Sequence, residues 1–321
     1  MLQVKNLTVA LEKDDKTCPI VKNLSYTLGA GETLAIVGES GCGKTMQALA
    51  VMGLLPPNIE VSGGEILFEN KNILNLTPKE RRKLNGESIA LIFQDALTSL
   101  NPVLTVKEHF LEVYKSRTNL TVKEAEEKIK ELLKQTELPP RVLTSYPHQL
   151  SGGQRQRVMI ALALTLNPKL LIADEPTTAL DENTQEQIIN LIKTIQQKRK
   201  MAVIFITHDL QLAKTVADKI FVLYAGTKIE EASTQDLFNN PLHPYTFGLL
   251  KAIVSKDTPK GKPLYEIPGT PPRDNNFSNC AFHNRCTKKT DNCTKSAPHL
   301  EELAPKHFCA CFLAKGGKND R

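Results

Sequence analysis

Residues 38–45 read GESGCGKT and lie between the apolar run TLAIV at residues 33–37 and the helical pattern MQALAVMGLL at residues 46–55. The apolar run has the length of a buried strand, and apolar residues after the loop recur at helical spacing. The glycines let the backbone turn tightly and direct its N–H groups at an anion, which the positive end of the following helix also favours. This stretch therefore predicts a phosphate-binding loop between a strand and a helix.

Two side chains of the loop have predicted roles. Lys44 is placed to contact the β- and γ-phosphates of a nucleotide, and the Thr45 hydroxyl is a ligand for Mg²⁺. The alternative, a chance glycine-rich turn, is disfavoured by the strand and helix on either side. The predicted nucleotide-binding residues are Gly38, Glu39, Ser40, Gly41, Cys42, Gly43, Lys44, Thr45 and Met46.

Composition places the chain among proteins with substantial cores. It has 321 residues, of which 40% are apolar and 24% are charged. It contains no signal-peptide pattern and no apolar run near 18 residues, so we expect a soluble chain whose membrane role would depend on partners. The formal net charge of +6 is spread among residues of both signs. This distribution predicts a solvated surface and no nucleic-acid partner.

The N-terminal part of the chain predicts a small antiparallel sheet. Apolar residues alternate with polar ones at Leu2, Val4, Leu7 and Val9, as in a half-buried strand. Further strands are expected at residues 21–28 and from residue 63. Together with the phosphate loop, these strands predict an antiparallel subdomain beside a nucleotide-binding core.

The middle of the chain predicts helices followed by parallel strands. A buried strand at residues 89–94 precedes helical patterns at 106–114 and 123–135, within a helical insertion of about sixty residues. Continuous apolar runs at 169–174 and 202–207 flank a helix at 185–197, which is typical of parallel strands covered on both faces. The last predicted helix covers residues 245–253. Residues 255–276 contain five prolines and predict a linker or an extended segment.

Ligands of such sheets bind at the carboxyl ends of the strands, where the sequence places several polar residues. Asp174 is suited to hold Mg²⁺ and Glu175 to polarise an attacking water, although two solvated acids at a strand end are the alternative. Gln94 is a further candidate for the Mg²⁺ shell or a surface glutamine. His208 is a candidate contact for the γ-phosphate or an ordinary histidine after a strand.

The stretch LSGGQRQR at residues 150–157 predicts a second anion site. Ser151 is a favourable helix N-cap, and Gly152 and Gly153 leave backbone N–H groups accessible ahead of an apolar helix. A single ATP does not need two such sites. We therefore expect a head-to-tail pair in which Ser151, Gly152, Gly153 and Gln154 of one subunit contact the ATP bound by the loop of another.

The motifs GESGCGKT, Gln94, LSGGQ, LLIADEP, TALD ending at Asp181, and ITHD resemble the ATPase subunit of an ABC transporter, in the order of that family. FQDALTSLNP, HPYTFGLL and IPGTPP resemble the D-type ATPase of oligopeptide, dipeptide and nickel importers. The resemblance implies an α/β fold: a RecA-like phosphate-loop NTPase core, an antiparallel β subdomain, a helical subdomain at about 95–160 and a small cysteine-rich C-terminal region. It implies an ABC ATPase domain at residues 1–235 and an importer-type C-terminal region at residues 236–321.

This resemblance also implies a mechanism and partners. Two ATPase subunits would close around two ATP molecules, with Glu175 and His208 as catalytic residues, Thr45, Gln94 and Asp174 at Mg²⁺, and Asp181 in the D-loop. The expected partners are an F-type ATPase paralogue, two membrane permeases and an extracytoplasmic solute-binding protein. The expected location is peripheral, on the cytoplasmic face of the membrane. The solute would be an oligopeptide, a dipeptide, nickel or a metal chelate. The alternative function is a soluble ABC ATPase that acts on nucleic acid or ribosomes.

Five of the seven cysteines lie in the last 42 residues, which in a cytosolic chain favours a metal or cluster site over disulfides. Their spacing differs from the paired cysteines of zinc ribbons. By resemblance to related importers, the ligands of a [4Fe-4S] cluster would be Cys280, Cys286, Cys293 and Cys311, the last of which follows a small residue. Cys309 is the alternative fourth ligand, and zinc or a metal-free tail are the alternatives to the cluster.

Overall fold

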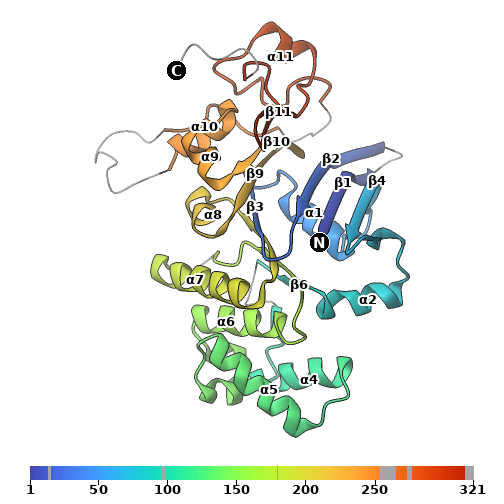
Figure 1. Ribbon diagram of the computed structural model, residues 1–321, viewed down its shortest axis with the longest axis vertical. Coiled ribbons are helices and arrows are strands. Elements are labelled where there is room, and N and C mark those ends of the chain that lie inside the picture. The colour runs from blue at the N-terminus through green and yellow to red at the C-terminus, as the bar shows by residue number, and fades with distance from the viewer. Residues whose placement is uncertain (14–15, 95–98, 179, 254–264, 273–276, 315–321) are drawn as a thin grey trace. The chain divides into compact units, whose positions relative to one another are not determined.

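The computed structural model describes residues 1–13, 16–94, 99–178, 180–253, 265–272 and 277–314. The chain divides into two compact units (Figure 1). The first unit comprises Met1–Leu28, Thr33–Asn75 and Thr207–Arg321, and the second comprises Gly29–Glu32 and Leu76–Ile206. Among the described residues, no helix combines the length and the apolar character that crossing a membrane requires.

The first unit contains two groups of strands and several short helices. Its strands are β1 (Leu2–Lys13), β2 (Lys16–Leu28), β3 (Thr33–Val37), β4 (Ile59–Phe68), β5 (Lys71–Asn72), β9 (Lys219–Tyr224), β10 (Thr227–Ser233), β11 (Glu301–Ala304) and β12 (His307–Cys309). Its helices are α1 (Lys44–Met52), the 3-10 helix η1 (Ile73–Asn75), α8 (Leu210–Val216), α9 (Thr234–Asn239), α10 (Pro244–Lys251) and α11 (Asp291–Lys295).

The antiparallel subdomain has the strand order β2-β1-β4-β5, and helix α1 lies against it. The predicted alternation is confirmed, because Leu2, Val4, Leu7 and Val9 are all buried. Leu7 follows Val4 by three residues, so strict alternation would turn it to the opposite face. The pairing of β1 with β2 shifts register between Val4 and Leu7, with Asn6 at φ 49°, and this irregularity restores the buried side.

The second group of strands in this unit has the order β11-β12-β10-β9-β3. β3 pairs in parallel with β9, with Val37 opposite Val222, while β9, β10, β12 and β11 pair in antiparallel fashion. Strands from the cysteine-rich end thus extend the sheet that contains β3. The boundary predicted after residue 235 stays a prediction, although strand pairing crosses it.

The second unit combines parallel strands with a group of helices. Its strands are β6 (Ile89–Ile92), β7 (Leu170–Asp174) and β8 (Ala202–Thr207). Its helices are α2 (Pro78–Glu87), α4 (Val106–Arg117), α5 (Val122–Gln135), the 3-10 helices η2 (Pro140–Thr144) and η3 (Pro147–Gln149), α6 (Gly152–Ala163) and α7 (Glu182–Arg199).

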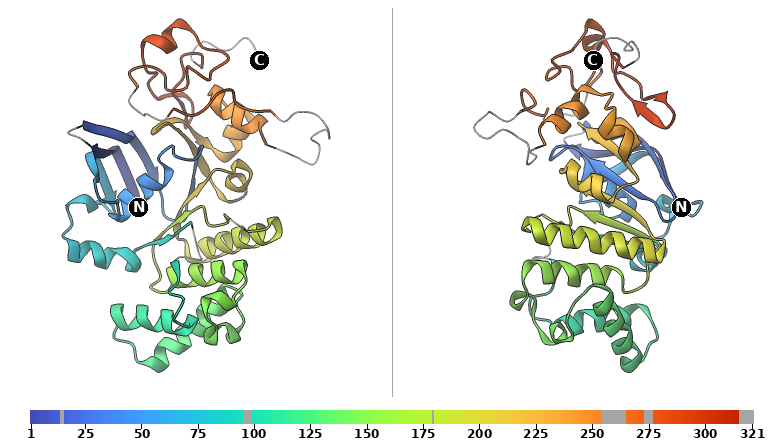
Figure 2. Two further views of the ribbon diagram at one scale, coloured as in Figure 1. Left: turned by 180° about the vertical axis from the view of Figure 1, so that it is seen from behind. Right: turned by 60° about the vertical axis from the view of Figure 1, so that its left-hand side comes forward.

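β6, β7 and β8 are parallel, as predicted, with Ile92 opposite Ala173 and Asp174 opposite Ile206. Helices α6 and α7 run side by side (Figure 2). Capping boxes begin both α4 and α5, where Thr105 pairs with Glu108 and Thr121 pairs with Glu124. The predicted α/β class with an antiparallel sheet and a helical insertion is confirmed.

Some elements differ from those predicted. β2 begins at Lys16 rather than near residue 21, and β6 ends at Ile92, two residues before Gln94. Helix α2 was not predicted, because its sequence PKERRKLNGE is polar and none of its residues is buried. Most of the proline-rich stretch predicted as a linker, including residues 255–264 and 273–276, lies outside the described residues.

A glycine substitution in the antiparallel subdomain tests the register shift. Gly64 has φ 93°, and a Cβ built on it would lie 2.5 Å from the Asn6 carbonyl oxygen. We expect Gly64→Ala to lower the free energy of unfolding by about 2–4 kcal/mol, because strain and overpacking add. The matched control is Gly63→Ala, whose Cβ would meet only the Thr8 side chain, at 3.9 Å. Urea unfolding followed by circular dichroism measures both, and equal stability of the two variants would contradict the prediction.

Candidate functional site

The predicted phosphate loop connects β3 to α1 in the first unit. Gly41 and Gly43 have φ values of 80° and 103°, which L-residues with side chains rarely adopt. A Cβ on Gly38 would lie 2.2 Å from the Leu223 carbonyl oxygen, so only glycine fits there. Gly43 is the N-cap of α1, whose first residue is Lys44. The loop thus turns tightly just before a helix N-terminus. Backbone N–H groups in this arrangement form a binding site for a phosphate group.

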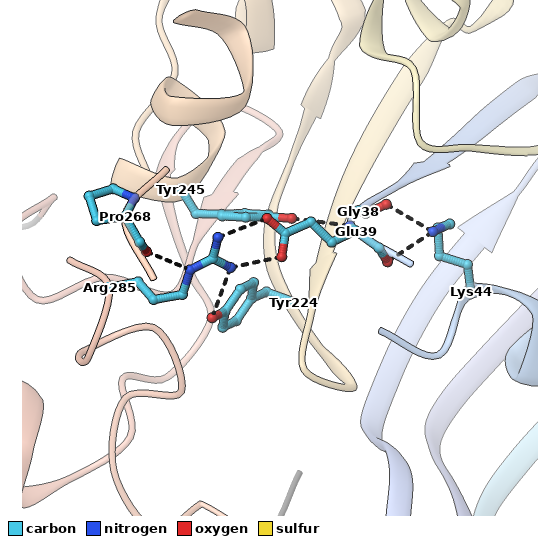
Figure 3. Close-up of polar contacts among 7 residues, drawn as sticks. All are labelled: Gly38, Glu39, Lys44, Tyr224, Tyr245, Pro268 and Arg285. Atoms are coloured by element: carbon cyan, nitrogen blue, oxygen red, sulfur yellow. Dashed lines mark hydrogen bonds and ion pairs between the residues drawn. The ribbon is translucent and has the colours of Figure 1, made fainter. Parts of the chain in front are cut away.

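Lys44 reaches back over the loop that precedes it. Its ammonium is buried and donates hydrogen bonds to the carbonyl oxygens of Gly38, at 2.8 Å, and Glu39, at 3.0 Å (Figure 3). The buried Cys42 contributes backbone contacts, because its carbonyl accepts from the Gly226 N–H at 3.0 Å. Burial raises the pKa of the Cys42 thiol. The loop therefore holds the Lys44 ammonium against its own carbonyl oxygens.

The second unit brings two predicted residues together. Gln94 Nε2 donates to Glu175 Oε2 at 3.2 Å, and the Thr178 hydroxyl donates to the same oxygen at 3.1 Å. Glu175 follows β7 with φ 46°, and its N–H donates to the Ile206 carbonyl oxygen at 2.9 Å. Asp174, one residue earlier, is buried. Gln94 and Glu175 meet because the strands that precede them are parallel and end at one edge.

The sequence analysis gave Thr178 no role, although it is the first residue of the quoted motif TALD. Its hydroxyl and the Gln94 amide both donate to one carboxylate oxygen of Glu175, so the side chain of Glu175 has a defined orientation. A threonine three residues after an acidic residue in a tight turn was the available signal.

The signature stretch begins a helix as predicted. Ser151 is the N-cap of α6, where its side chain accepts from the Gln154 N–H at 3.3 Å and the Gln154 side chain accepts from the Ser151 N–H at 3.1 Å. The N–H groups of the first helical residues have no carbonyl partner within the helix. A Cβ on Gly153 would lie 2.7 Å from the Thr184 methyl group, so close packing against α7 requires glycine there.

Two further predicted residues lie at element ends. Asp181 is the N-cap of α7, and hydrogen bonds from Thr184 lower the pKa of its carboxyl group. His208 follows β8 and is exposed. It belongs to the first unit with the phosphate loop, whereas Gln94, Asp174, Glu175 and Ser151 belong to the second.

The structure adds to the phosphate loop a contact that the sequence did not predict. The Glu39 carboxylate pairs with the Arg285 guanidinium, with N–O distances of 2.7 and 3.0 Å, and the Glu39 N–H donates to the Tyr245 hydroxyl at 3.1 Å (Figure 3). Arg285 is 246 residues from Glu39 in the chain. No local pattern signals a contact of this separation.

The C-terminal thiols are gathered in one region. Burial, with smaller contributions from Cys293, Cys311 and Cys286, raises the pKa of Cys280 to about 11. Among the described residues, no group of three or more His, Cys, Asp or Glu side chains is arranged to hold a metal ion. The ligand set predicted for the cluster therefore stays a prediction. Four cysteines are nevertheless the number of thiolate donors that a [4Fe-4S] cluster requires.

The fold and these motifs define a class of protein: a phosphate-loop ATPase with a helical insertion that carries LSGGQ, the arrangement of an ABC ATPase cassette. Residues 21–178 match the ABC transporter family. The chain is also similar to solved ABC cassettes. It superimposes on the dimeric structure of MJ0796, a bacterial ABC transporter cassette, with a TM-score of 0.65 and 32% identity over 73% of this chain and 99% of that chain.

Residues 229–293 match the C-terminal region of the oligopeptide/dipeptide transporter family. The chain is 44% identical to the oligopeptide transport ATP-binding protein OppD of Escherichia coli, over 97% of this chain and 93% of the relative. It is 43% identical to the dipeptide transport ATP-binding protein DppD of Bacillus subtilis, over 98% and 94%. The chain therefore belongs to the ATP-binding proteins of oligopeptide and dipeptide ABC transporters, as the sequence predicted, and it is an ATPase.

Proposed function

We propose that this ATPase powers the import of oligopeptides or dipeptides through an ABC transporter. The observation that carries the proposal is the combination, in one chain, of an ABC cassette with the C-terminal region of oligopeptide/dipeptide transporters. OppD and DppD are described by the peptides that their transporters carry, and they match nearly the whole chain. These relatives support peptides over nickel or a metal chelate as the solute.

In the proposed mechanism, residues 38–46 bind the phosphates of ATP, with Lys44 turning from the loop carbonyls to the phosphate oxygens. Thr45, Gln94 and Asp174 are the proposed Mg²⁺ ligands, since carboxylate, amide and hydroxyl oxygens suit this hard cation. Mg²⁺, when bound, neutralises charge on the phosphate oxygens. Ser151, Gly152, Gly153 and Gln154 would contact the ATP of a second ATPase subunit, beside the D-loop residue Asp181.

Glu175 is the proposed general base. It accepts a proton from water as the water oxygen forms a bond to the γ-phosphorus, and the bond to the β–γ bridging oxygen breaks to give ADP and phosphate. His208 is proposed to contact the γ-phosphate. The hydrogen bonds from Gln94 and Thr178 support the role of Glu175, because they hold its carboxylate in one orientation.

Replacing the proposed base tests the mechanism. We expect Glu175→Gln to lower kcat for ATP hydrolysis by at least about 100-fold while ATP still binds, because the amide keeps the shape but cannot take the proton. The control is Glu186→Gln, an exposed position on α7. Steady-state phosphate release and binding of a fluorescent nucleotide measure the two properties. Unchanged turnover in Glu175→Gln would refute its assignment.

The proposed partners are a second ATPase subunit of the F type, two membrane permeases and an extracytoplasmic solute-binding protein. The chain would then act at the cytoplasmic face of the membrane, as a peripheral subunit. This arrangement is inferred from the transporter family that the chain belongs to. A soluble ABC ATPase that acts on nucleic acid or ribosomes is the competing function.

Purification of the tagged chain from detergent-solubilised membranes distinguishes these functions. We expect two multi-span permeases and a second ATPase to co-purify, and we expect the complex in vesicles to hydrolyse ATP faster with a peptide-loaded binding protein. The empty binding protein is the matched control. Co-purification with ribosomes, or hydrolysis stimulated by RNA or DNA and not by the loaded binding protein, would contradict the import function.

We further propose that Cys280, Cys286, Cys293 and Cys311 hold a [4Fe-4S] cluster. Their electrostatic influence on one another supports this set: the other three cysteines raise the pKa of Cys280, and Cys286 and Cys293 raise the pKa of Cys311. Cluster binding would require loss of the thiol protons, so iron would have to lower the raised pKa of Cys280 in the loaded protein.

Anaerobic purification tests the cluster. We expect a broad absorbance near about 400 nm with stoichiometric iron and sulfide, as thiolate-ligated [4Fe-4S] centres have. Cys293→Ser should abolish this absorbance, whereas the exposed Cys18→Ser should retain it. A colourless wild-type protein with stoichiometric zinc, or with no metal, would overturn the proposal.

A further inference from the structure

Arg285 lies in the cysteine-rich region, yet its side chain is directed at the phosphate loop (Figure 3). Its two terminal nitrogens donate to both oxygens of the Glu39 carboxylate, at 2.7 and 3.0 Å, and Nε donates to the Pro268 carbonyl oxygen at 2.9 Å. The Arg285 side chain is 5% exposed and the Glu39 side chain is 26% exposed, so water screens this pair only from the Glu39 side. Such two-point pairing fixes the orientation of both partners.

The surroundings of Arg285 are fixed by an aromatic cluster. The Phe282 ring packs against the rings of Tyr224 and Tyr245, with centroids 5.2 and 5.4 Å apart, and the Arg285 N–H donates to the Phe282 carbonyl oxygen at 3.0 Å. Tyr224 ends strand β9, which pairs with β3 immediately before the phosphate loop. Arg285 is therefore held in place by the sheet that supports the loop.

Glu39 is held at two points by residues far from it in the chain. Arg285 binds its carboxylate, and the Tyr245 hydroxyl accepts its backbone N–H. The Glu39 carbonyl oxygen in turn accepts from the Lys44 ammonium. A shift of Glu39 would therefore move the carbonyl that Lys44 contacts and change the backbone path of the loop.

The negative charge of Glu39 makes its ion pair with Arg285 relevant to nucleotide binding as well as to stability. Glu39 places a carboxylate in a loop that accepts a polyphosphate, and an uncompensated negative charge there would oppose binding of the anion. We propose that Arg285 is a positioning residue of the nucleotide site: it neutralises Glu39 and holds it away from the phosphates. The C-terminal region would thus set the nucleotide affinity of the loop. This inference rests on the proposed role of residues 38–46 as the nucleotide site.

The test compares three variants of the full chain by titration with a fluorescent ATP analogue in the presence of Mg²⁺. Arg285→Gln should raise the Kd for the analogue at least about tenfold, because it leaves the charge of the partly buried Glu39 uncompensated beside the phosphates. The double variant Arg285→Gln with Glu39→Gln should recover an affinity within about threefold of wild type, because the charge is gone and two amides can still hydrogen-bond. A purely structural role of Arg285 would not predict this rescue.

The matched control is Arg199→Gln. Arg199 is a half-buried arginine that donates to Leu164, Asn167 and Gln135, none of which is a proposed site residue. The Arg199→Gln variant should leave the Kd for the fluorescent ATP analogue unchanged. Wild-type affinity in a folded Arg285→Gln, or a double variant as weak as Arg285→Gln, would overturn the inference.

Two further variants keep the result decisive. Lys44→Ala tests the site itself: if it binds nucleotide as wild type does, the proposed role of the loop fails, and if it alone loses binding, only the inference about Arg285 fails. Should Arg285→Gln not fold, as judged by circular dichroism, Arg285→Lys replaces it. Lysine keeps the charge but loses the two-point pairing, so a Kd severalfold above wild type is expected and an unchanged Kd would contradict positioning.

Discussion

The close approach of the phosphate loop to the end of β9 is the constraint on which the nucleotide site depends. Gly38 packs against the Leu223 carbonyl so tightly that no Cβ fits, and the Cys42 carbonyl accepts from the Gly226 N–H. Since β3 and β9 are parallel neighbours, the loop leaves the sheet beside the turn that follows β9. A loop formed by residues 38–45 thus takes its shape from residues about 180 positions later in the chain.

Local patterns account for what the sequence predicted well. The Ser151 cap needs only residues 151–154, and the meeting of Gln94 with Glu175 follows from recognising the strands before them as parallel. Contacts between distant segments left no periodic signal. The pairing of β12 with β10 and the Arg285–Glu39 ion pair depend on how far-apart residues pack, which neither hydropathy nor spacing encodes. The polar helix α2 was missed for the related reason that it buries none of its residues.

Glu175 also shows what a sequence pattern leaves out. A glutamate with φ 46° occupies a region that side chains disfavour, at a cost on the order of 1 kcal/mol or more. The Ile206 carbonyl holds its backbone, while Gln94 and Thr178 hold its side chain. A strained backbone that contacts on both sides hold in place is typical of a preorganised site. In such a site the carboxylate is already oriented before the ligand binds.

The same reasoning about environment separates the last two cysteines. Glu230 is fully buried, and its carboxylate accepts from the backbone N–H groups of Leu242 and His243 and pairs with the His307 ring. Strand β12 is thereby tied to β10 by side-chain as well as backbone bonds. Burial and the Glu230 charge raise the pKa of the Cys309 thiol, which favours a neutral core side chain. Cys311 also raises the pKa of Cys309 to a smaller extent, whereas burial, Cys286 and Cys293 raise the pKa of Cys311 itself. The buried carboxylate of Glu230 therefore affects the thiol of Cys309, and two further cysteines affect the thiol of Cys311.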